Sequence, residues 1–221
     1  MRGEKMKLLR MFALVGALLT STAHGDLVNP EVPSWQGSAG TAHYGWNSFT
    51  SAYGAPNFPD FGNAGGAMLY NFAPGATITS SGNLYNPTGG LDIHIYGYGP
   101  LTQAVLNLAS GGTEFDYDSV TLVAYDAIGN SYAWAADTSS INSYEADGWG
   151  GFNVSSSFTW DVGDLGMSIA EWGFLVQGTA PHNSLDAASV DVAMAPVPAP
   201  GALLLLGAFG LSSTRNRRRV G

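Results

Sequence analysis

Apolar and polar side chains alternate along several stretches of the chain, which is the pattern of β-strands that bury one face. Residues 91–98 place leucine and isoleucine at every second position, and residues 119–125 repeat this spacing with valine, leucine and alanine. In residues 151–162, phenylalanine, valine and tryptophan occupy one set of alternate positions, and polar residues occupy the other. Residues 171–178 and 188–194 follow the same rule. We therefore predict strands in all of these segments.

Turn residues frame these strands. Residues 127–130, Ala-Ile-Gly-Asn, join two strand-like runs, and we predict a hairpin because glycine and asparagine tolerate positive φ. Residues 99–112 carry leucine and valine at helical spacing but also suit a strand, so the sequence leaves both structures open. Residues 35–74 are rich in glycine, asparagine, proline and aromatic residues, which predicts short strands and long loops.

The fold class follows from the alternating segments. Strands separated by turn clusters predict an all-β protein with a single antiparallel β-sandwich of the jelly-roll type. The chain has 221 residues, enough for one domain and processing segments, and we place the domain at residues 26–195. Its 30 glycines and 12% aromatic residues suit a β protein rich in loops. The absence of cysteine excludes disulfides and thiolate chemistry.

Charge is distributed unevenly along the chain. All eight Lys and Arg residues lie near the two ends, and none lies between Asp26 and Pro196. Of the 17 acidic residues, all except Glu4 lie in this central stretch, which therefore carries sixteen negative charges at pH 7. Nucleic acid is excluded as a partner, because binding to phosphates depends on Lys and Arg. Salt screens the repulsion between these acidic side chains, so the composition suits a protein that works in a salty environment outside the cell.

The N-terminus has the features of a secretory signal peptide at residues 1–25. A basic start is followed by an apolar stretch at residues 11–19 and by a small-residue end, Ala-His-Gly. We predict cleavage after Gly25, so that Asp26 becomes the first residue of the exported protein. The alternative is an uncleaved anchor, which the short apolar stretch disfavours because a spanning helix needs about 20 residues.

The C-terminus forms a second processing signal at residues 196–221. Prolines precede a short apolar segment at residues 201–211, and arginines follow it. We expect this segment to insert transiently into the inner membrane, with the arginines on the cytoplasmic side. The three parts in this order resemble the PEP-CTERM sorting signal of Gram-negative bacteria, through Val197, Pro198, Pro200, Arg217, Arg218 and Arg219.

The resemblance implies how the protein is processed. PEP-CTERM proteins are cut by an exosortase, a membrane protease that recognises the proline hinge, and are attached to the cell surface or to extracellular polysaccharide. We therefore expect a short C-terminal sorting helix and a location on the surface or in the extracellular matrix of a Gram-negative bacterium. The common signal has glutamate where this chain has Ala199. The alternative is a tail anchor that is never cut.

The candidate metal ligands are Glu114, Asp116 and Asp118, at alternate positions of one short run. On an extended strand these carboxylates share one face and supply part of a calcium shell. The alternative is a solvated strand edge whose charges deter pairing with other chains. Asp161 and Asp164 form a second, weaker cluster. Apart from calcium, we expect no cofactor.

The sequence predicts no catalytic residue. His94 lies two positions from Asp92, and His43 and His182 add two imidazoles, but their spacing matches no metal-binding motif. We interpret Asp92 and His94 as outward-facing strand residues. The sequence contains no nucleophile elbow, phosphate-binding loop or zinc-protease helix motif. The protein is therefore predicted not to be an enzyme.

Aromatic residues are the remaining indication of function. Those in the loop-rich front and near strand ends suit stacking against sugar rings, and the competing interpretation is that they fill the core. The residues concerned are Trp35, Tyr44, Trp46, Tyr53, Phe58, Phe61, Tyr96, Tyr98, Trp134 and Trp149.

These observations predict an exported, surface- or matrix-associated β-sandwich with a structural or binding role, with an exosortase and extracellular polysaccharide as partners. Two alternatives stay open. A secreted polysaccharide hydrolase or lyase needs a carboxylate pair or a His–Tyr set in a groove. A calcium-dependent adhesin or lectin needs oxygen atoms that converge on residues 114–118.

Overall fold

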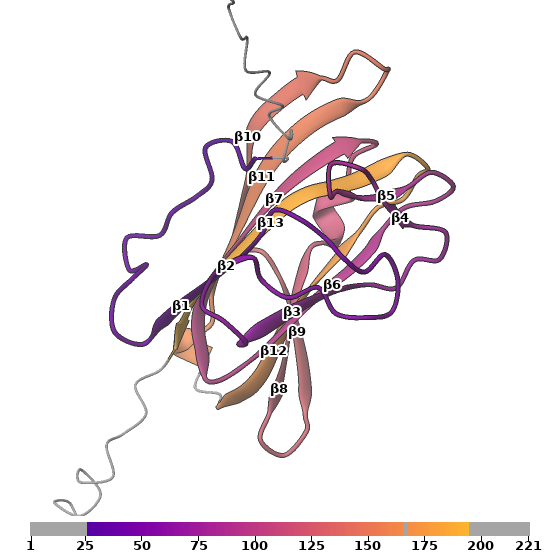
Figure 1. Cartoon of the computed structure of the whole chain (residues 1–221). Helices are drawn as coiled ribbons and strands as arrows, with labels where there is room; N and C mark the ends of the chain where they lie inside the picture. The colour runs from indigo at the N-terminus through magenta and orange to yellow at the C-terminus, as the bar shows by residue number, and fades with distance from the viewer. Residues whose placement is uncertain (1–25, 166–167, 195–221) are drawn as a thin grey trace, which may run out of the picture.

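The computed structural model describes residues 26–165 and 168–194. The predicted signal peptide with its cleavage site at Gly25 and the predicted sorting tail with its apolar segment 201–211 lie outside these residues and stay predictions. Within the described part of the chain, no helix is long and apolar enough to cross a membrane. This part folds into the predicted all-β sandwich of two antiparallel sheets (Figure 1).

Sheet A is the larger layer. In spatial order its main path contains β10 (Thr138–Ala146), β11 (Phe152–Asp161), β7 (Leu101–Gly112), β13 (Asn183–Met194), β1 (Thr41–Trp46) and β2 (Phe61–Gly62). Two short strands extend it, since β5 (Leu84–Asn86) pairs with the start of β13 and β4 (Thr77–Ile78) pairs with β5.

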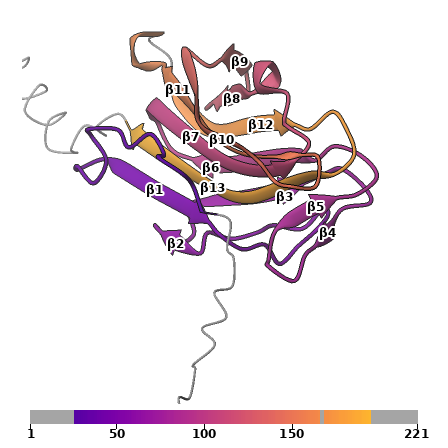
Figure 2. The same cartoon turned by 90° about the horizontal axis from the view of Figure 1, so that it is seen from above.

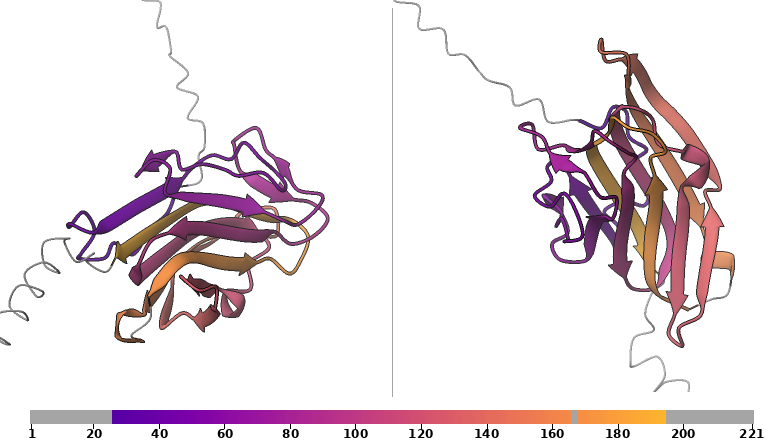
Figure 3. Two further views of the ribbon diagram at one scale, coloured as in Figure 1. Left: turned by 90° about the horizontal axis from the view of Figure 1, so that it is seen from below. Right: turned by 90° about the vertical axis from the view of Figure 1, so that its right-hand side faces the viewer.

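Sheet B covers the other side of the core (Figures 2 and 3). Its order is β3 (Ala67–Asn71), β6 (Asp92–Tyr98), β12 (Ile169–Gln177), β8 (Thr121–Asp126) and β9 (Ser131–Ala135). Two 3-10 helices, η1 (Tyr117–Ser119) and η2 (Gly163–Leu165), lie in connections between the sheets. The chain crosses between the layers so often that most neighbouring strands are not consecutive, as in jelly rolls.

Large apolar side chains from both sheets fill the core between them. Trp46, Phe158, Trp172 and Phe174 are almost completely buried. The indole N–H of Trp46 donates to the carbonyl of Asn57 at 3.0 Å, so the polar end of this ring has a partner. The loop-rich front therefore contributes to the core as well as to the surface.

The strand predictions are confirmed by the burial pattern. Ile93 and Ile95 of β6 and Leu122 and Ala124 of β8 are fully buried, as their alternation indicated. β8 and β9 form the predicted hairpin. Residues 99–112, for which helix and strand were both open, contain β7, which pairs along its length with β11 and β13. Pairing on both sides decides the structure here, because local pattern alone is a weak guide.

One polar face of sheet A is covered by the chain itself. Ser155 and Ser157 point away from the core, yet each is only 2% exposed. Residues 26–33, here called the N-terminal strap, lie over them (indigo in Figure 1). The backbone N–H of Glu31 donates to Asn107 Oδ1 at 2.9 Å, and Asn107 Nδ2 donates back to the Glu31 carbonyl at 3.1 Å. This reciprocal pair fixes the strap to the centre of the sheet.

Candidate functional site

Strand register shapes a groove on the outer face of sheet A. Tyr85, Ser184, Gly111, Asn153 and Glu145 are paired side by side across β5, β13, β7, β11 and β10. Residues paired in this way point to the same face of a sheet. Because the middle of the row has the smallest side chains and its two sides have larger ones, the surface is hollow along the middle.

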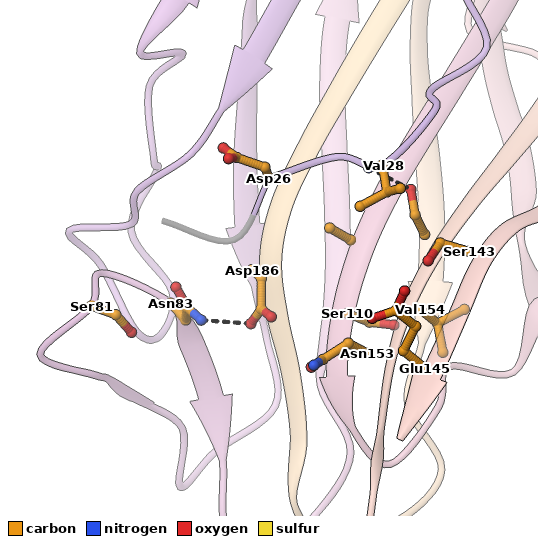
Figure 4. Close-up of a pocket in the computed structure, with 12 residues that line it drawn as sticks. Asp26, Val28, Ser81, Asn83, Ser110, Ser143, Glu145, Asn153, Val154 and Asp186 are labelled. Atoms are coloured by element: carbon orange, nitrogen blue, oxygen red, sulfur yellow. Dashed lines mark hydrogen bonds between the residues drawn. The ribbon is translucent and has the colours of Figure 1, made fainter. Parts of the chain in front are cut away.

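A β-bulge adds a carboxyl group to this groove. The pairing of β13 with β7 shifts between Leu185 and Ala187, so Asp186 is an extra residue in the strand. Asp186 Oδ1 accepts a hydrogen bond from Asn83 Nδ2 at 2.7 Å (Figure 4). It accepts a second one from Ser184 Oγ at 2.6 Å. Burial raises the pKa of Asp186, and the two hydrogen bonds offset only part of this effect.

Two adjoining pockets of about 450 and 640 Å³ make up the groove and share Asn83, Asn153 and Asp186. The strap borders the first pocket through Val28, whose backbone N–H donates to a serine of β11 at 3.2 Å. Glu145 lies across this pocket from Asp186 (Figure 4). The groove is therefore bounded by segments that are distant in the sequence.

The second pocket reaches the β10–β11 loop, where Trp149 is 95% exposed. Asp147 Oδ1 accepts hydrogen bonds from the backbone N–H groups of Trp149 at 2.7 Å and Gly151 at 3.0 Å, which orders the loop. Tyr85 and His182 line the same pocket, and the Tyr85 hydroxyl lies 2.6 Å from His182 Nδ1. His182 has a φ of 64°, which residues other than glycine adopt rarely.

The groove is rich in hydrogen-bond acceptors and poor in positive charge. Asp26, Glu145, Asp147 and Asp186 line it, and residues 26–194 contain no Lys or Arg. Asn83 Oδ1 is buried and has no hydrogen-bond partner among the described residues. The carboxylates of the groove suit a ligand that donates hydrogen bonds, whereas an anion would meet repulsion without compensation.

The predicted calcium ligands lie away from this groove and contact different partners. Glu114 Oε1 accepts a hydrogen bond from the hydroxyl of Tyr144 at 2.8 Å. Asp116 precedes η1, with its backbone N–H bonded to the carbonyl of Gln177 at 2.8 Å, and Asp118 lies in the first turn of η1. Across residues 26–165 and 168–194, no group of three or more His, Asp or Glu side chains is placed to hold a metal ion. Calcium binding at these residues stays a prediction.

The second acidic cluster is also drawn into local contacts. Asp161 Oδ2 accepts a hydrogen bond from Gln103 Nε2 at 2.8 Å, and its Oδ1 accepts one from the backbone of Gly163 at 3.2 Å. Asp164 belongs to η2. In the part of the chain that the structure describes, Asp161 and Asp164 belong to no group of three or more His, Asp or Glu side chains placed to hold a metal ion.

The three histidines of the domain lie in separate places. His94 Nε2 is 3.0 Å from Asp92 Oδ1, and both residues face outward from sheet B, as expected. His43 Nδ1 is 2.8 Å from Oδ1 of the buried Asp191 beside the strap. His182 is in the groove. The structure thus assembles His–Asp and His–Tyr pairs that the spacing along the sequence did not single out as sites.

The residues that build the groove were missed by sequence analysis because they form no local motif. Asn83, Asn153 and Asp186 come from β-strands or loops that are tens of residues apart. The sequence did contain one indication of the groove. The alternation of apolar and polar residues has one phase at Leu185 and the opposite phase at Val190. Such a phase change marks a bulge.

Comparison with known proteins identifies no family. No protein-family model matches the chain, and no curated protein sequence does. Among solved structures, the enzymatically active domain of tailspike protein 4 from bacteriophage CBA120 is similar, with 13% identity and a TM-score of 0.26. The match covers 68% of this chain and 19% of that one. A likeness at this TM-score supports no inference about function.

Proposed function

We propose that this protein is an exported, surface- or matrix-associated β-sandwich that binds extracellular polysaccharide in the groove of sheet A. The observation that carries the proposal is the combination of an open groove lined by amides, hydroxyls and carboxylates with the almost fully exposed ring of Trp149 at its end. Sugars present hydroxyl groups on their edges and apolar C–H surfaces on their faces. Both parts of the groove therefore have a counterpart in a sugar chain.

Charge narrows the class of polysaccharide. A polyuronate or a sulfated chain carries negative charge, and the groove opposes it with Asp26, Glu145, Asp147 and Asp186 and no cation. A neutral chain, or one with free amino groups, meets no such repulsion. The proposal therefore names neutral and amino-sugar polysaccharides, and it disfavours lyase action on uronates for the same reason.

The cellular part of the proposal rests on the two terminal signals. Removal of residues 1–25 would export the domain, and exosortase cleavage near Val197, Pro198 and Pro200 would release it from the inner membrane. A tag placed after Gly221 should be lost in a host with an exosortase and kept in a host without one. Retention of the tag in both hosts would contradict sorting and leave the tail-anchor alternative.

Binding is tested with the purified protein on gels that contain neutral or amino-sugar polysaccharides. Trp149→Ala should weaken binding about tenfold, because one stacked ring contributes about 1 kcal/mol beyond its area. Asn153→Ala removes an amide from the shared part of the groove and should weaken binding severalfold. Phe58→Ala is the matched control, since Phe58 is 61% exposed and lies outside the groove. Equal binding by all variants would refute the assignment of the groove.

A second candidate function is favoured by one observation. Asp186 has a raised pKa within the groove, and Glu145 lies across the first pocket, as the two carboxyl groups of a glycoside hydrolase would. Under this hypothesis Asp186→Asn abolishes release of reducing ends from the bound polysaccharide and keeps binding. If the wild-type protein releases no reducing ends from any chain that it binds, the non-catalytic function stands.

A further inference from the structure

The outer face of sheet B carries several aromatic side chains on the side of the molecule opposite the groove. Alternation in β6 and β8 places its residues outward, because Ile93, Ile95, Leu122 and Ala124 point into the core. We call this surface the sheet B platform, and it consists of Tyr70, Phe72, His94, Tyr96, Tyr98 and Tyr125.

Four rings of the platform, those of Tyr70, Phe72, His94 and Tyr96, hold one another in place. Phe72 contacts the ring of His94 edge to face, with centroids 4.8 Å apart and planes at 89°. Tyr70 is nearly parallel to Phe72 at 5.7 Å and lies 6.1 Å from Tyr96. Such contacts between rings restrict their rotation. The aromatic surface is therefore preorganised, which lowers the entropy lost when a ligand binds.

A chain of hydrogen bonds orients the polar atoms of the platform. His94 Nε2 lies 3.0 Å from Asp92 Oδ1, and His94 Nδ1 lies 2.7 Å from the hydroxyl of Tyr96. In the neutral tautomer of His94 that carries its proton on Nε2, Nε2 donates to the carboxylate of Asp92, and the Tyr96 hydroxyl donates to Nδ1. In this arrangement the Tyr96 oxygen can accept a hydrogen bond from a donor outside the protein.

Glycine at one position lets the platform extend across three strands. Tyr96 is paired with Gly173 of β12, and a Cβ atom there would lie 2.7 Å from the Tyr96 ring. The ring therefore lies over β12. In the next row Glu171 is paired with both Tyr98 and Tyr125, which are 58% and 40% exposed. Aromatic faces and hydrogen-bonding groups thus alternate over one sheet surface.

The negative charge of the domain excludes some of the partners that an aromatic surface could bind. A second copy of the domain would bring sixteen further negative charges, and Asp92 and Glu171 already lie on or beside the platform. Anionic lipids and polyanions meet the same repulsion, since residues 26–194 supply no Lys or Arg. A neutral sugar chain meets none, and its C–H faces and hydroxyl groups match the alternation of rings and polar atoms.

We propose that the sheet B platform binds a neutral β-1,4-linked polysaccharide, whose extended chain would lie across the strands and contact rings of β3, β6 and β8 through its C–H faces. This site is separate from the groove of sheet A, and it stands whether or not the groove binds sugar. When both sites are occupied, one molecule links two polysaccharide chains through opposite faces of the sandwich.

The test is depletion of the purified protein by microcrystalline cellulose, measured as a binding isotherm. Tyr98→Ala and Tyr70→Ala should each weaken binding about tenfold, and Tyr96→Phe, which keeps the ring and loses the hydroxyl, should weaken it severalfold. Phe58→Ala is the matched control, because it removes an exposed aromatic ring that belongs neither to the platform nor to the groove and should leave cellulose binding unchanged. Unchanged melting temperatures of the variants show that the fold is kept.

Three results would overturn the platform proposal. The first is that the wild-type protein does not bind cellulose. The second is that Trp149→Ala weakens binding to cellulose while Tyr98→Ala and Tyr70→Ala leave it unchanged, which assigns cellulose to the groove alone. The third is a dimer in sedimentation equilibrium that Tyr98→Ala dissociates, because a second copy then covers the platform. Failure of the groove proposal would appear separately, as loss of the Trp149→Ala effect on the polysaccharide gels.

Discussion

The two outer faces of this sandwich share one core but differ in shape and chemistry. Each face has a glycine in an inner strand, Gly111 near the end of β7 in sheet A and Gly173 in the middle of β12 in sheet B. Over Gly111 the nearest side chain is the carboxylate of Asp186, 3.2 Å from the place of a Cβ atom, and the surface stays open. Over Gly173 the ring of Tyr96 occupies the space.

The residues around each glycine therefore determine the shape of the surface at that position. In sheet A the adjoining residues are small and polar, and the result is an acidic groove. In sheet B the paired residues are Tyr96 and Val123, and the Tyr96 ring fills the space above the glycine. Because the same core supports both faces, variants can separate the two surfaces from each other and from the fold.

The largest effect is expected from a substitution in the common core, which should weaken binding at both faces together. Trp172 lies at the centre of sheet B, is 1% exposed, and packs 5.7 Å from Phe174. Trp172→Ala should cost about 3–5 kcal/mol of unfolding free energy, because it leaves a large cavity. Urea denaturation measures this loss, and binding to both the groove and the platform should fall in parallel. Retention of either activity at full strength would show that this face does not depend on the common core.

Gly173→Ala should disturb sheet B alone. The added Cβ atom would lie 2.7 Å from the Tyr96 ring and 2.9 Å from the backbone oxygen of Ile95, and a backbone atom yields with difficulty. We expect a loss of about 1–3 kcal/mol and weaker binding to cellulose. Gly111→Ala is the matched control in sheet A, where the nearest atom is the end of a side chain. Equal losses for both variants in thermal melting would contradict the contrast between the two glycines.

Asn107→Ala should disturb sheet A alone. Asn107 is 1% exposed and bonds both backbone groups of Glu31, so its removal frees the strap and leaves buried polar groups without partners. A loss of about 1–3 kcal/mol is expected. Hydrogen exchange of the Glu31 amide should become faster, and binding in the groove should weaken while binding to cellulose persists. Slow exchange at Glu31 in the variant would show that other contacts hold the strap.

Much of the fold was predictable because it depends on local alternation. The phases of β6, β8 and β11 follow directly from apolar residues at every second position, and the hairpin between β8 and β9 follows from a Gly-Asn turn. The structure of residues 99–112 was not predictable in this way. Leucine and valine suit a helix there until pairing with β11 and β13 is known, and that pairing involves residues about 40 to 90 positions away.

The candidate sites were less predictable because they arise from register between distant strands. Tyr96, Tyr98 and Trp149 were expected as candidates for sugar stacking, but Tyr44 and Trp46, expected on the same grounds, are buried in the core. Residue type alone does not distinguish the two environments. Acids adjacent in the sequence, such as Glu114 and Asp116, lie apart from the groove, whereas Asp186 enters it through a bulge.

The stability contributed by Asp186 in sheet A and by Asp126 in sheet B should change with pH in opposite directions. Burial raises the pKa of Asp186 above its ordinary value of 3.8, so the folded state binds its proton more tightly than the unfolded chain does. Its contribution to stability is complete below that value and is lost as the pH rises through the raised pKa. Asp186→Asn should abolish this loss, so the variant should gain stability relative to wild type as the pH rises above 4, measured by melting temperature. A constant difference between the two proteins across this range would contradict an unfavourable buried charge.

The smallest expected effect is at Asp126, which begins the exposed turn between β8 and β9. Slight desolvation acts to raise its pKa, but hydrogen bonds from the side chain and backbone of Asn130 and from the backbone of Ile128 outweigh this effect and lower the pKa below 3.8. The contribution of Asp126 is therefore present above this value and lost as the pH falls through the lowered pKa. Asp126→Ala should lower the melting temperature slightly at neutral pH and not in strong acid. Because the carboxylate is exposed to solvent, the change in melting temperature should be smaller than that caused by Asp186→Asn. An equal or larger change would mean that the turn between β8 and β9 contributes more to stability than its exposure indicates.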